Sequence, residues 1–236
     1  MSGAPRVEAL IVAIPSRDEQ LLLADCLGSV ERARRLLRRA RPDVRVQVVV
    51  ALDLCTDASA EVAAEFPVVA VPSMSGCVGK ARDVAVRNGL SLVGDGTPLD
   101  ATWIACTDAD SRVPRDWLIT QIEFADAGTD LLVGTVEPTG AIDPLLLQGW
   151  RERHQLTEGH PHIHGANLGM RAATWAAVGG FGEFAVHEDV RLVERARTTG
   201  VAVSATDRTR VHTSARRIGR VDEGFAAYLA AMTRAG

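Results

Sequence analysis

The chain has 236 residues, of which 47% are hydrophobic and 24% are charged, so it can bury a core without disulfide or metal support and is too apolar for wholesale disorder. Its 30 acidic and 26 basic residues give a formal net charge of −4, which excludes a generally basic nucleic-acid-binding protein. Aromatic residues make up 4% of the chain, which argues against binding by aromatic stacking. We therefore expect no nucleic-acid partner.

The four cysteines form no CxxC pair and stand among apolar or small residues, which is typical of reduced thiols in a cytoplasmic protein. The opening stretch MSGAPRVEAL has no basic region followed by an apolar one, so we expect no secretion signal. No apolar run approaches the ~20 residues of a membrane-spanning helix, and no transmembrane segment is expected. The composition leaves a peripheral membrane contact open.

Short β-branched runs alternate with helical patterns along the first part of the chain. The patterns predict strands at 7–14, 44–52, 68–71, 102–107 and 131–136, and helices at 19–40, 56–65, 80–92 and 114–127, with Thr56 as a helix cap and Pro114 as a first helical residue. After about Gly140 they predict helices near 171–177 and 188–199, a strand at 201–205, a basic segment at 208–220 and a final helix to about Thr233. This alternation predicts an α/β fold in one compact domain, with a mostly parallel sheet and helices on both faces.

Ligands of such sheets bind beyond the carboxyl ends of the strands, where the sequence carries its sharpest feature. The apolar run ending at Thr107 is followed by Asp108 and Asp110, two carboxylates separated by one residue. Two anions in one crevice repel each other and are costly to bury, and a divalent cation removes both problems. Because Mg²⁺ is usually held by one or two carboxylates plus substrate phosphates, the pair predicts a site for Mg²⁺ or Mn²⁺ carrying a diphosphate. The alternative is that both residues cap a turn before Pro114.

Other motifs surround this pair in a fixed order. They are AIPSRDE at 13–19, VALDLCTD at 50–57, GKARDVAVRNG at 79–89, GANLGMR at 165–171, VGGF at 178–181, HED at 187–189 and VHTSARR at 211–217. In order and spacing the series resembles glycosyltransferase family 2 and its GT-A relatives over about residues 7–220. The resemblance implies one Rossmann-like GT-A domain over 1–236, with a nucleotide-binding half at about 7–136 and an acceptor and catalytic half at about 137–236.

The resemblance also implies which residues hold a UDP- or GDP-linked sugar donor. They are Pro15, Ser16, Arg17, Glu19, Asp53, Lys80, Arg82, Asp108, Asp110, Arg216 and Arg217. Asp53 follows the second strand, where Leu52 and Cys55 depart from the family's Asp-Asp-x-Ser-x-Asp pattern. Simpler interpretations stay open. Glu19 can be an acidic residue at a helix start, where the helix dipole favours negative charge, and Lys80 and Arg82 can lie on an exposed basic helix face.

Asp110 and His212 are the implied metal ligands, because in metal-dependent GT-A enzymes a late histidine often completes the metal shell. His212 lies in a run with five arginines and no acid between residues 208 and 220, which also suits a surface for acidic lipid or a partner protein.

For inverting transfer, the resemblance assigns Asp189 as the base that deprotonates the acceptor hydroxyl, with Glu188 as second choice. The alternative is an acidic cap on the helix that follows them. The acceptor-side residues are His164, Gly165 and Asn167. His154, His160, His162 and His164 can also be interpreted as a zinc site, but we interpret them as flanking the acceptor pocket.

The expected activity is therefore metal-dependent transfer of a sugar to a hydroxyl acceptor, either a small molecule or a lipid-linked one. A homodimer is also compatible with the sequence. Nucleotidyl transfer is disfavoured because the loop at 15–19 lacks glycine. A retaining transferase and a non-catalytic nucleotide- or metal-binding module stay open.

Overall fold

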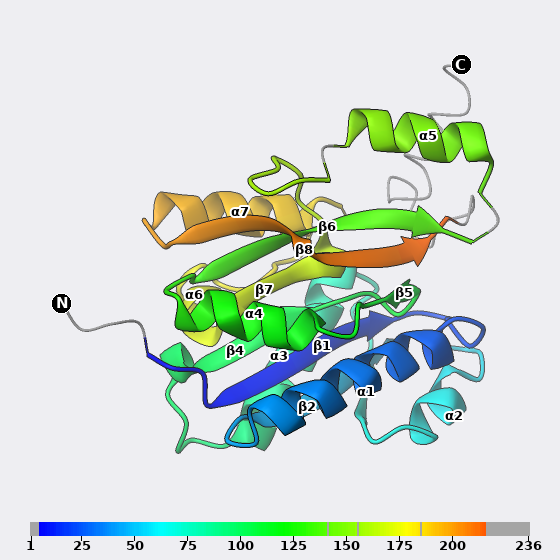
Figure 1. Ribbon diagram of the computed structural model, residues 1–236. Coiled ribbons are helices and arrows are strands. Elements are labelled where there is room, and N and C mark those ends of the chain that lie inside the picture. The colour runs from blue at the N-terminus through cyan, green and yellow to red at the C-terminus, as the bar shows by residue number, and fades with distance from the viewer. Residues whose placement is uncertain (1–4, 141, 155, 185, 216–236) are drawn as a thin grey trace.

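A single eight-stranded sheet, in the order β3-β2-β1-β4-β7-β6-β8-β5, runs through the computed structural model, which describes residues 5–140, 142–154, 156–184 and 186–215 (Figure 1). The strands are β1 (Ala9–Ser16), β2 (Arg45–Asp53), β3 (Val69–Ser73), β4 (Thr102–Cys106), β5 (Ser111–Arg112), β6 (Leu131–Thr139), β7 (Leu168–Arg171) and β8 (Val203–Ser214). The helices are α1 (Leu23–Ala40), α2 (Ser59–Ala64), α3 (Val78–Val93), α4 (Trp117–Asp126), α5 (Pro144–Arg153), α6 (Ala172–Ala177) and α7 (Glu188–Thr198), with 3-10 turns η1 (Leu99–Ala101) and η2 (Gly165–Asn167).

The strand directions bring the carboxyl ends of most strands to one edge of the sheet. β3, β2, β1 and β4 are parallel neighbours, and β6 and β8 are parallel to each other. β7 runs antiparallel to both β4 and β6, so β6 points the same way as β4. The predicted α/β fold with a mostly parallel sheet is confirmed. The sequence did not predict β7, which lies within the GANLGMR motif at 165–171, or the two-residue β5, which is antiparallel to β8.

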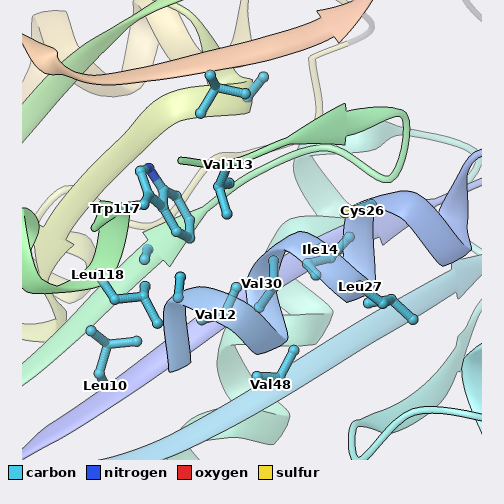
Figure 2. Packing of buried hydrophobic residues seen from close by; sticks show 14 of the residues in the cluster. Leu10, Val12, Ile14, Cys26, Leu27, Val30, Val48, Val113, Trp117 and Leu118 are labelled. Atoms are coloured by element: carbon cyan, nitrogen blue, oxygen red, sulfur yellow. The ribbon is translucent and has the colours of Figure 1, made fainter. Parts of the chain in front are cut away.

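Alternation along β1 divides the core into two layers. Leu10, Val12 and Ile14 face one side, where they join a cluster with α1, α2 and α4 (Figure 2). Ala13 joins the opposite cluster, to which β2, α3, α6 and α7 contribute. Helices therefore cover both faces of the sheet, as predicted. Among the described residues, no helix combines the length and the apolar character needed to cross a membrane.

Several predicted boundaries were wrong, each for a local reason. Pro114 does not begin a helix: its carbonyl accepts the Trp117 N–H in a turn, and α4 begins only at Trp117. Thr56 does not cap α2, because its N–H and hydroxyl both bind Asp18 instead. The strand predicted at 201–205 continues to Ser214 and takes up half of the basic segment. The predicted final helix lies outside the described residues.

Helix α5 was missed although its start carries two ordinary helix signals. Pro144 stands at the first helical position, and the Asp143 side chain accepts hydrogen bonds from the Leu145 and Leu146 N–H groups at 2.7 and 3.4 Å. Both features are typical of a helix N-terminus. Figure 1 shows α5 apart from the other helices, on the side toward which the β6 arrow points.

Candidate active site at the carboxyl edge of the sheet

Three of the predicted site carboxylates lie around one buried thiol. Burial and the nearby carboxylates of Asp110, Asp108 and Glu19 raise the pKa of Cys26 above its ordinary value. The Cys26 thiol also donates to the Asp108 carbonyl at 3.4 Å. The end of β1 and the loop after β4 are therefore brought together at the start of α1, as the parallel topology predicts.

Arg82 occupies the centre of this edge and is only 2% exposed. Its guanidinium donates to Asp108 Oδ1 at 2.6 Å and to Glu188 Oε1, and it lies 5.5 Å from the centre of the Phe181 ring. Burial alone would lower the pKa of Arg82, but the Asp108 and Glu188 carboxylates raise it above its ordinary value. One buried cation thus joins the loop after β4 to the start of α7.

Two glycines make room for this arrangement. A Cβ on Gly165 would lie 2.6 to 2.8 Å from the guanidinium atoms of Arg82. A Cβ on Gly79 would lie 2.9 Å from the Glu188 side chain and 3.0 Å from the Gly182 carbonyl oxygen. These distances are shorter than carbon atoms tolerate, so the backbone can approach the ion pairs only where the side chain is absent.

Asp110 is held from a different side than Asp108. The hydroxyls of Ser111 and Thr213 donate to Asp110 Oδ1 at 3.3 and 3.5 Å, and they bind each other at 2.9 Å. Both aspartates are half-buried, so neither is sealed inside the protein. His212 is exposed and precedes Thr213 on β8, where successive side chains point to opposite faces. The structure therefore brings Thr213, rather than His212, beside Asp110.

The loops that follow β1 and β2 bind each other through side chains. Asp18 Oδ1 accepts the N–H groups of Thr56 and Asp57 at 2.7 and 3.3 Å, and Asp57 Oδ2 accepts the Gln20 N–H at 2.9 Å. Asp18, Cys55 and Asp57 form the one group of three potential metal ligands within 4.8 Å of one another in the described part of the chain. The hydrogen bonds between the loops account for this cluster without a metal ion.

Asp53 stabilises the loop after β3 through hydrogen bonds. It is 3% exposed, and its Oδ1 accepts hydrogen bonds from the Ser73 hydroxyl, the Ser75 N–H and hydroxyl and the Gly76 N–H at 2.8 to 3.1 Å. The residue predicted to recognise the base therefore also fixes the backbone that leads into α3.

Two buried hydroxyls at this edge have no hydrogen-bond partner among the described residues. They are Ser16 Oγ at the end of β1 and Thr107 Oγ1 just after β4. Buried polar groups are normally paired, so both are suited to contact a ligand or water. Ser16 was predicted as a donor-binding residue, whereas Thr107 was missed although it directly precedes Asp108.

Asp189 lies at the start of α7, between the acceptor-side segment and Arg82. Its Oδ2 accepts the Gly165 N–H at 2.6 Å and its Oδ1 accepts the Val190 N–H at 2.8 Å. Burial and the neighbouring Glu188 raise the pKa of Asp189 above its ordinary value. Arg82 opposes this shift, and of the two acids it is Glu188 that is buried in an ion pair with Arg82.

The predicted acceptor residues differ in their surroundings. Asn167 is 2% exposed, accepts from Trp117 Nε1 at 2.9 Å and donates to the Thr135 and Thr209 carbonyls at 2.7 Å each. It therefore links α4, β6 and β8 to one another from inside the protein. His164 is half-buried and directly precedes η2, the turn that contains Gly165 and Asn167.

The histidine cluster is formed by the end of α5 and the segment before η2. His154 stacks on Trp150 with ring centres 3.4 Å apart, and His162 lies 4.8 Å from His154 and 6.2 Å from His164. Burial and the neighbouring histidines lower the pKa of His164 to about 3. No three of these side chains meet the 4.8 Å ligand spacing among the described residues, so the cluster shows no assembled zinc site.

The remaining predicted donor residues differ in exposure, and two of them lie outside the described residues. Pro15 is buried at the end of β1, and Arg17 is exposed in the loop that follows. Lys80, at the start of α3, forms an ion pair with the exposed Glu183. Arg216 and Arg217 lie outside the described residues.

Known proteins resemble this chain in fold. The structure of S. aureus TarS 1–349 in complex with UDP has a TM-score of 0.65 and 15% identity, covering 88% of this chain and 61% of that one. The mannosyltransferase PcManGT from Pyrobaculum calidifontis, with GDP-Man and Mn²⁺, has a TM-score of 0.64 and 18% identity, covering 93% and 61%. GalNAc-T7 with UDP, GalNAc and Mn²⁺ has a TM-score of 0.63 and 12% identity, covering 92% and 46%.

The chain spans 46 to 61% of the length of those proteins, and 37% of another TarS structure. Identities this low establish a shared GT-A fold alone. A search of curated protein sequences finds no significant match. The family model for glycosyl transferase family 2, however, matches residues 11–177, which include the ends of β1 to β4, the Asp108–Asp110 pair and the Gly165 segment. The chain therefore belongs to glycosyl transferase family 2.

Proposed function

We propose that the protein is a metal-dependent glycosyltransferase that moves a sugar from a UDP- or GDP-linked donor to a hydroxyl acceptor. The observation that carries the proposal is Arg82, which joins the carboxylate after β4 to the acidic start of α7. A donor-side motif and a catalytic motif are thereby fixed relative to each other. Family membership and similar folds solved with UDP or with GDP-Man and Mn²⁺ support this assignment.

The position of Arg82 favours a role different from the one inferred from the resemblance. We expected this residue to bind the diphosphate, but it is buried and already balances two carboxylates. We therefore assign it as a positioning residue. Of the predicted donor-binding cations within the described residues, Arg17 and Lys80 are the ones that are not buried and can approach a donor phosphate.

Asp110 fits a divalent cation better than Asp108 does. Its carboxylate lies among the Ser111 and Thr213 hydroxyls, and oxygen ligands of this kind suit Mg²⁺ and Mn²⁺. Asp108 is already compensated by Arg82. A divalent ion bound at Asp110 would stabilise the negative charge that develops on the departing diphosphate. Participation of His212 remains a prediction.

We assign Asp189 as the base in an inverting transfer. A carboxylate whose pKa is raised is a stronger base than an ordinary aspartate, and burial gives Asp189 that property. It would accept the proton of the acceptor hydroxyl while that oxygen attacks the anomeric carbon. The Gly165 N–H, which donates to Oδ2, holds the carboxylate in one orientation.

The test compares Asp110→Asn with the wild-type protein. We expect wild type to gain thermal stability with UDP or GDP only when Mn²⁺ or Mg²⁺ is present, because a ligand bound to the folded state raises its apparent stability. Asp110→Asn should lose this metal-dependent gain and the release of nucleoside diphosphate from a nucleotide sugar. Asp116→Asn, at an exposed acid just before α4, is the matched control. Unchanged turnover in Asp110→Asn would refute the proposal.

A further inference from the structure

Four of the six histidines of the chain lie together where the end of α5 meets the segment before η2. They form the histidine cluster described above, which the proposed donor site and the assigned base do not use. His154 and His160 are buried, and His162 and His164 are half-buried. Histidines that lie next to one another inside a protein call for an explanation, because each is costly to charge there.

Three of these side chains are held in the neutral form. Burial lowers the pKa of His154 and of His162, and burial together with the neighbouring histidines lowers the pKa of His164 to about 3. The neighbours that act on the pKa of His164 are His154, His162 and His160, so the positive charge of any one ring disfavours that of the others. The neutral imidazole is the form in which histidine binds a metal ion.

Backbone carbonyls fix the position of the proton on two of the rings. His154 Nδ1 lies 2.9 Å from the Trp150 carbonyl oxygen, and His160 Nε2 lies 3.3 Å from the Thr206 carbonyl oxygen. A carbonyl oxygen only accepts, so each of these nitrogens carries the proton, and the lone pair is on Nε2 of His154 and on Nδ1 of His160. His160 Nδ1 is buried and has no hydrogen-bond partner among the described residues. Histidines that bind metal ions almost always donate their other ring N–H in this way.

The spacing of three ring centres is close to that of imidazoles on one metal ion. The centres of His154 and His162 are 4.8 Å apart, and the centre of His164 lies 6.3 and 6.2 Å from them. Centres at these separations are all about 3.4 Å from one common point, and a Zn–N bond of about 2.1 Å puts an imidazole centre about 3.2 Å from the metal. The ring nitrogens of the three are not within 4.8 Å of one another, so rotation about χ1 and χ2 has to complete the site.

We propose that His154, His162 and His164 bind one divalent transition-metal ion of the Zn²⁺ type. Imidazole nitrogens suit such ions, whereas Mg²⁺ and Mn²⁺ prefer oxygen ligands such as those around Asp110. The histidine site is therefore separate from the site proposed for the transfer reaction, and it does not rest on the transferase function. A bound ion would tie the end of α5 to the segment that leads into η2, where Gly165 donates to Asp189.

The experiment titrates the full chain with Zn²⁺ in a calorimeter, using protein made without a histidine tag, treated with a chelator and free of nucleotide. We expect wild type to bind about one Zn²⁺ ion and to gain thermal stability from it. His162→Asn and His164→Asn, tested separately, should each weaken binding at least about ten-fold, because each removes one of three ligands. X-ray absorption of wild type loaded with Zn²⁺ needs no variant and should show about three imidazole ligands.

The matched control is His187→Asn. It removes a histidine outside the cluster, at a φ of 61° that asparagine adopts more readily than most residues. It should bind Zn²⁺ as wild type does. Circular dichroism establishes that each variant is folded before its affinity is compared.

Four results would overturn the proposal: no saturable binding by wild type, undiminished binding by either folded variant, an equal loss in His187→Asn, or X-ray absorption without imidazole ligands. Asp110→Asn is titrated in parallel and should bind Zn²⁺ as wild type does, since its loss of the ion would place Zn²⁺ at Asp110 and refute the histidine site. Stabilisation by UDP or GDP with Mn²⁺ is measured separately. Its absence in wild type refutes the proposed function alone, whereas failed Zn²⁺ binding refutes this inference alone.

Discussion

Arg82 of α3 and Glu188 of α7 form a buried ion pair between residues 106 positions apart in the chain. The same guanidinium binds Asp108, so three elements meet at one side chain. A buried cation with two carboxylate partners is costly to disrupt, because removing it leaves two negative charges without compensation. The stability of the fold and the geometry of the site therefore depend on the same residue.

Replacing Arg82 with Met should lower the free energy of unfolding by about 3–5 kcal/mol, the range typical of breaking a buried ion pair from one side. Urea unfolding followed by circular dichroism measures this change. Arg82→Lys should recover only part of the loss, since a lysine keeps the charge but not the two-pronged geometry that reaches both acids.

The double variant Arg82→Met, Glu188→Gln tests whether Arg82→Met destabilises the fold through uncompensated negative charge or through lost packing contacts. Because Glu188→Gln removes one of the uncompensated charges, the double variant should be more stable than Arg82→Met alone. If Arg82→Met unfolds at the wild-type urea concentration, the ion pairs do not support the fold as we describe.

Sequence patterns predicted most of the elements that lie in the parallel half of the sheet. Continuous apolar runs mark β1, β2 and β4, and the acidic pair after β4 marks the edge where the site lies. The reversed strand β7 was not predictable in the same way, because Leu168–Arg171 is only four residues long and follows a glycine-containing turn. Its direction is decided by pairing with β4 and β6, which are distant in sequence.

The roles of individual site residues were less predictable than their location. Arg82 looked like a phosphate ligand because it follows Lys80 at a helix start, and only the folded structure shows that it is buried beside Glu188 of α7. Likewise, Thr213 rather than His212 contacts Asp110, since the register of β8 decides which of two neighbours faces the site. Such contacts depend on elements that meet only in the folded protein.

Asp189→Asn should abolish most sugar transfer while leaving donor binding intact. General base catalysis contributes about 10²- to 10⁴-fold, so kcat should fall within that range. In wild type, kcat should decline as the pH is lowered through a pKa above the ordinary aspartate value of 3.8, because the base acts only when ionised. Glu194→Gln, an exposed acid on the same helix, is the control. Unchanged kcat in Asp189→Asn would assign the base elsewhere.

Asn167→Ala should act on stability rather than on acceptor affinity. The change leaves Trp117 Nε1 and the Thr135 and Thr209 carbonyls without their partner inside the protein. Each unpaired buried group costs about 1–3 kcal/mol, so we expect a loss of at least about 2 kcal/mol in the free energy of unfolding. Asn88→Ala, at an exposed asparagine, should change it by less than about 0.5 kcal/mol. An acceptor KM raised without loss of stability would instead support direct acceptor contact.

The depressed pKa of His164 predicts that the protein loses stability in mild acid. Its pKa is about 3 in the folded state against 6.5 for an ordinary histidine, so below pH 6.5 the unfolded chain binds more protons. Stability should therefore be fully present above pH 6.5 and fall as the pH is lowered toward 3, by up to about 1.4 kcal/mol per pH unit for this one group. Urea unfolding of wild type and of His164→Phe from pH 8 to pH 5 isolates the contribution of His164 to the pH dependence of the free energy of unfolding. The difference between the two proteins should stay constant between pH 8 and 7 and shift in favour of His164→Phe below pH 6.5. A difference that stays constant down to pH 5 would show that His164 takes up its proton as readily in the folded protein as in the unfolded chain.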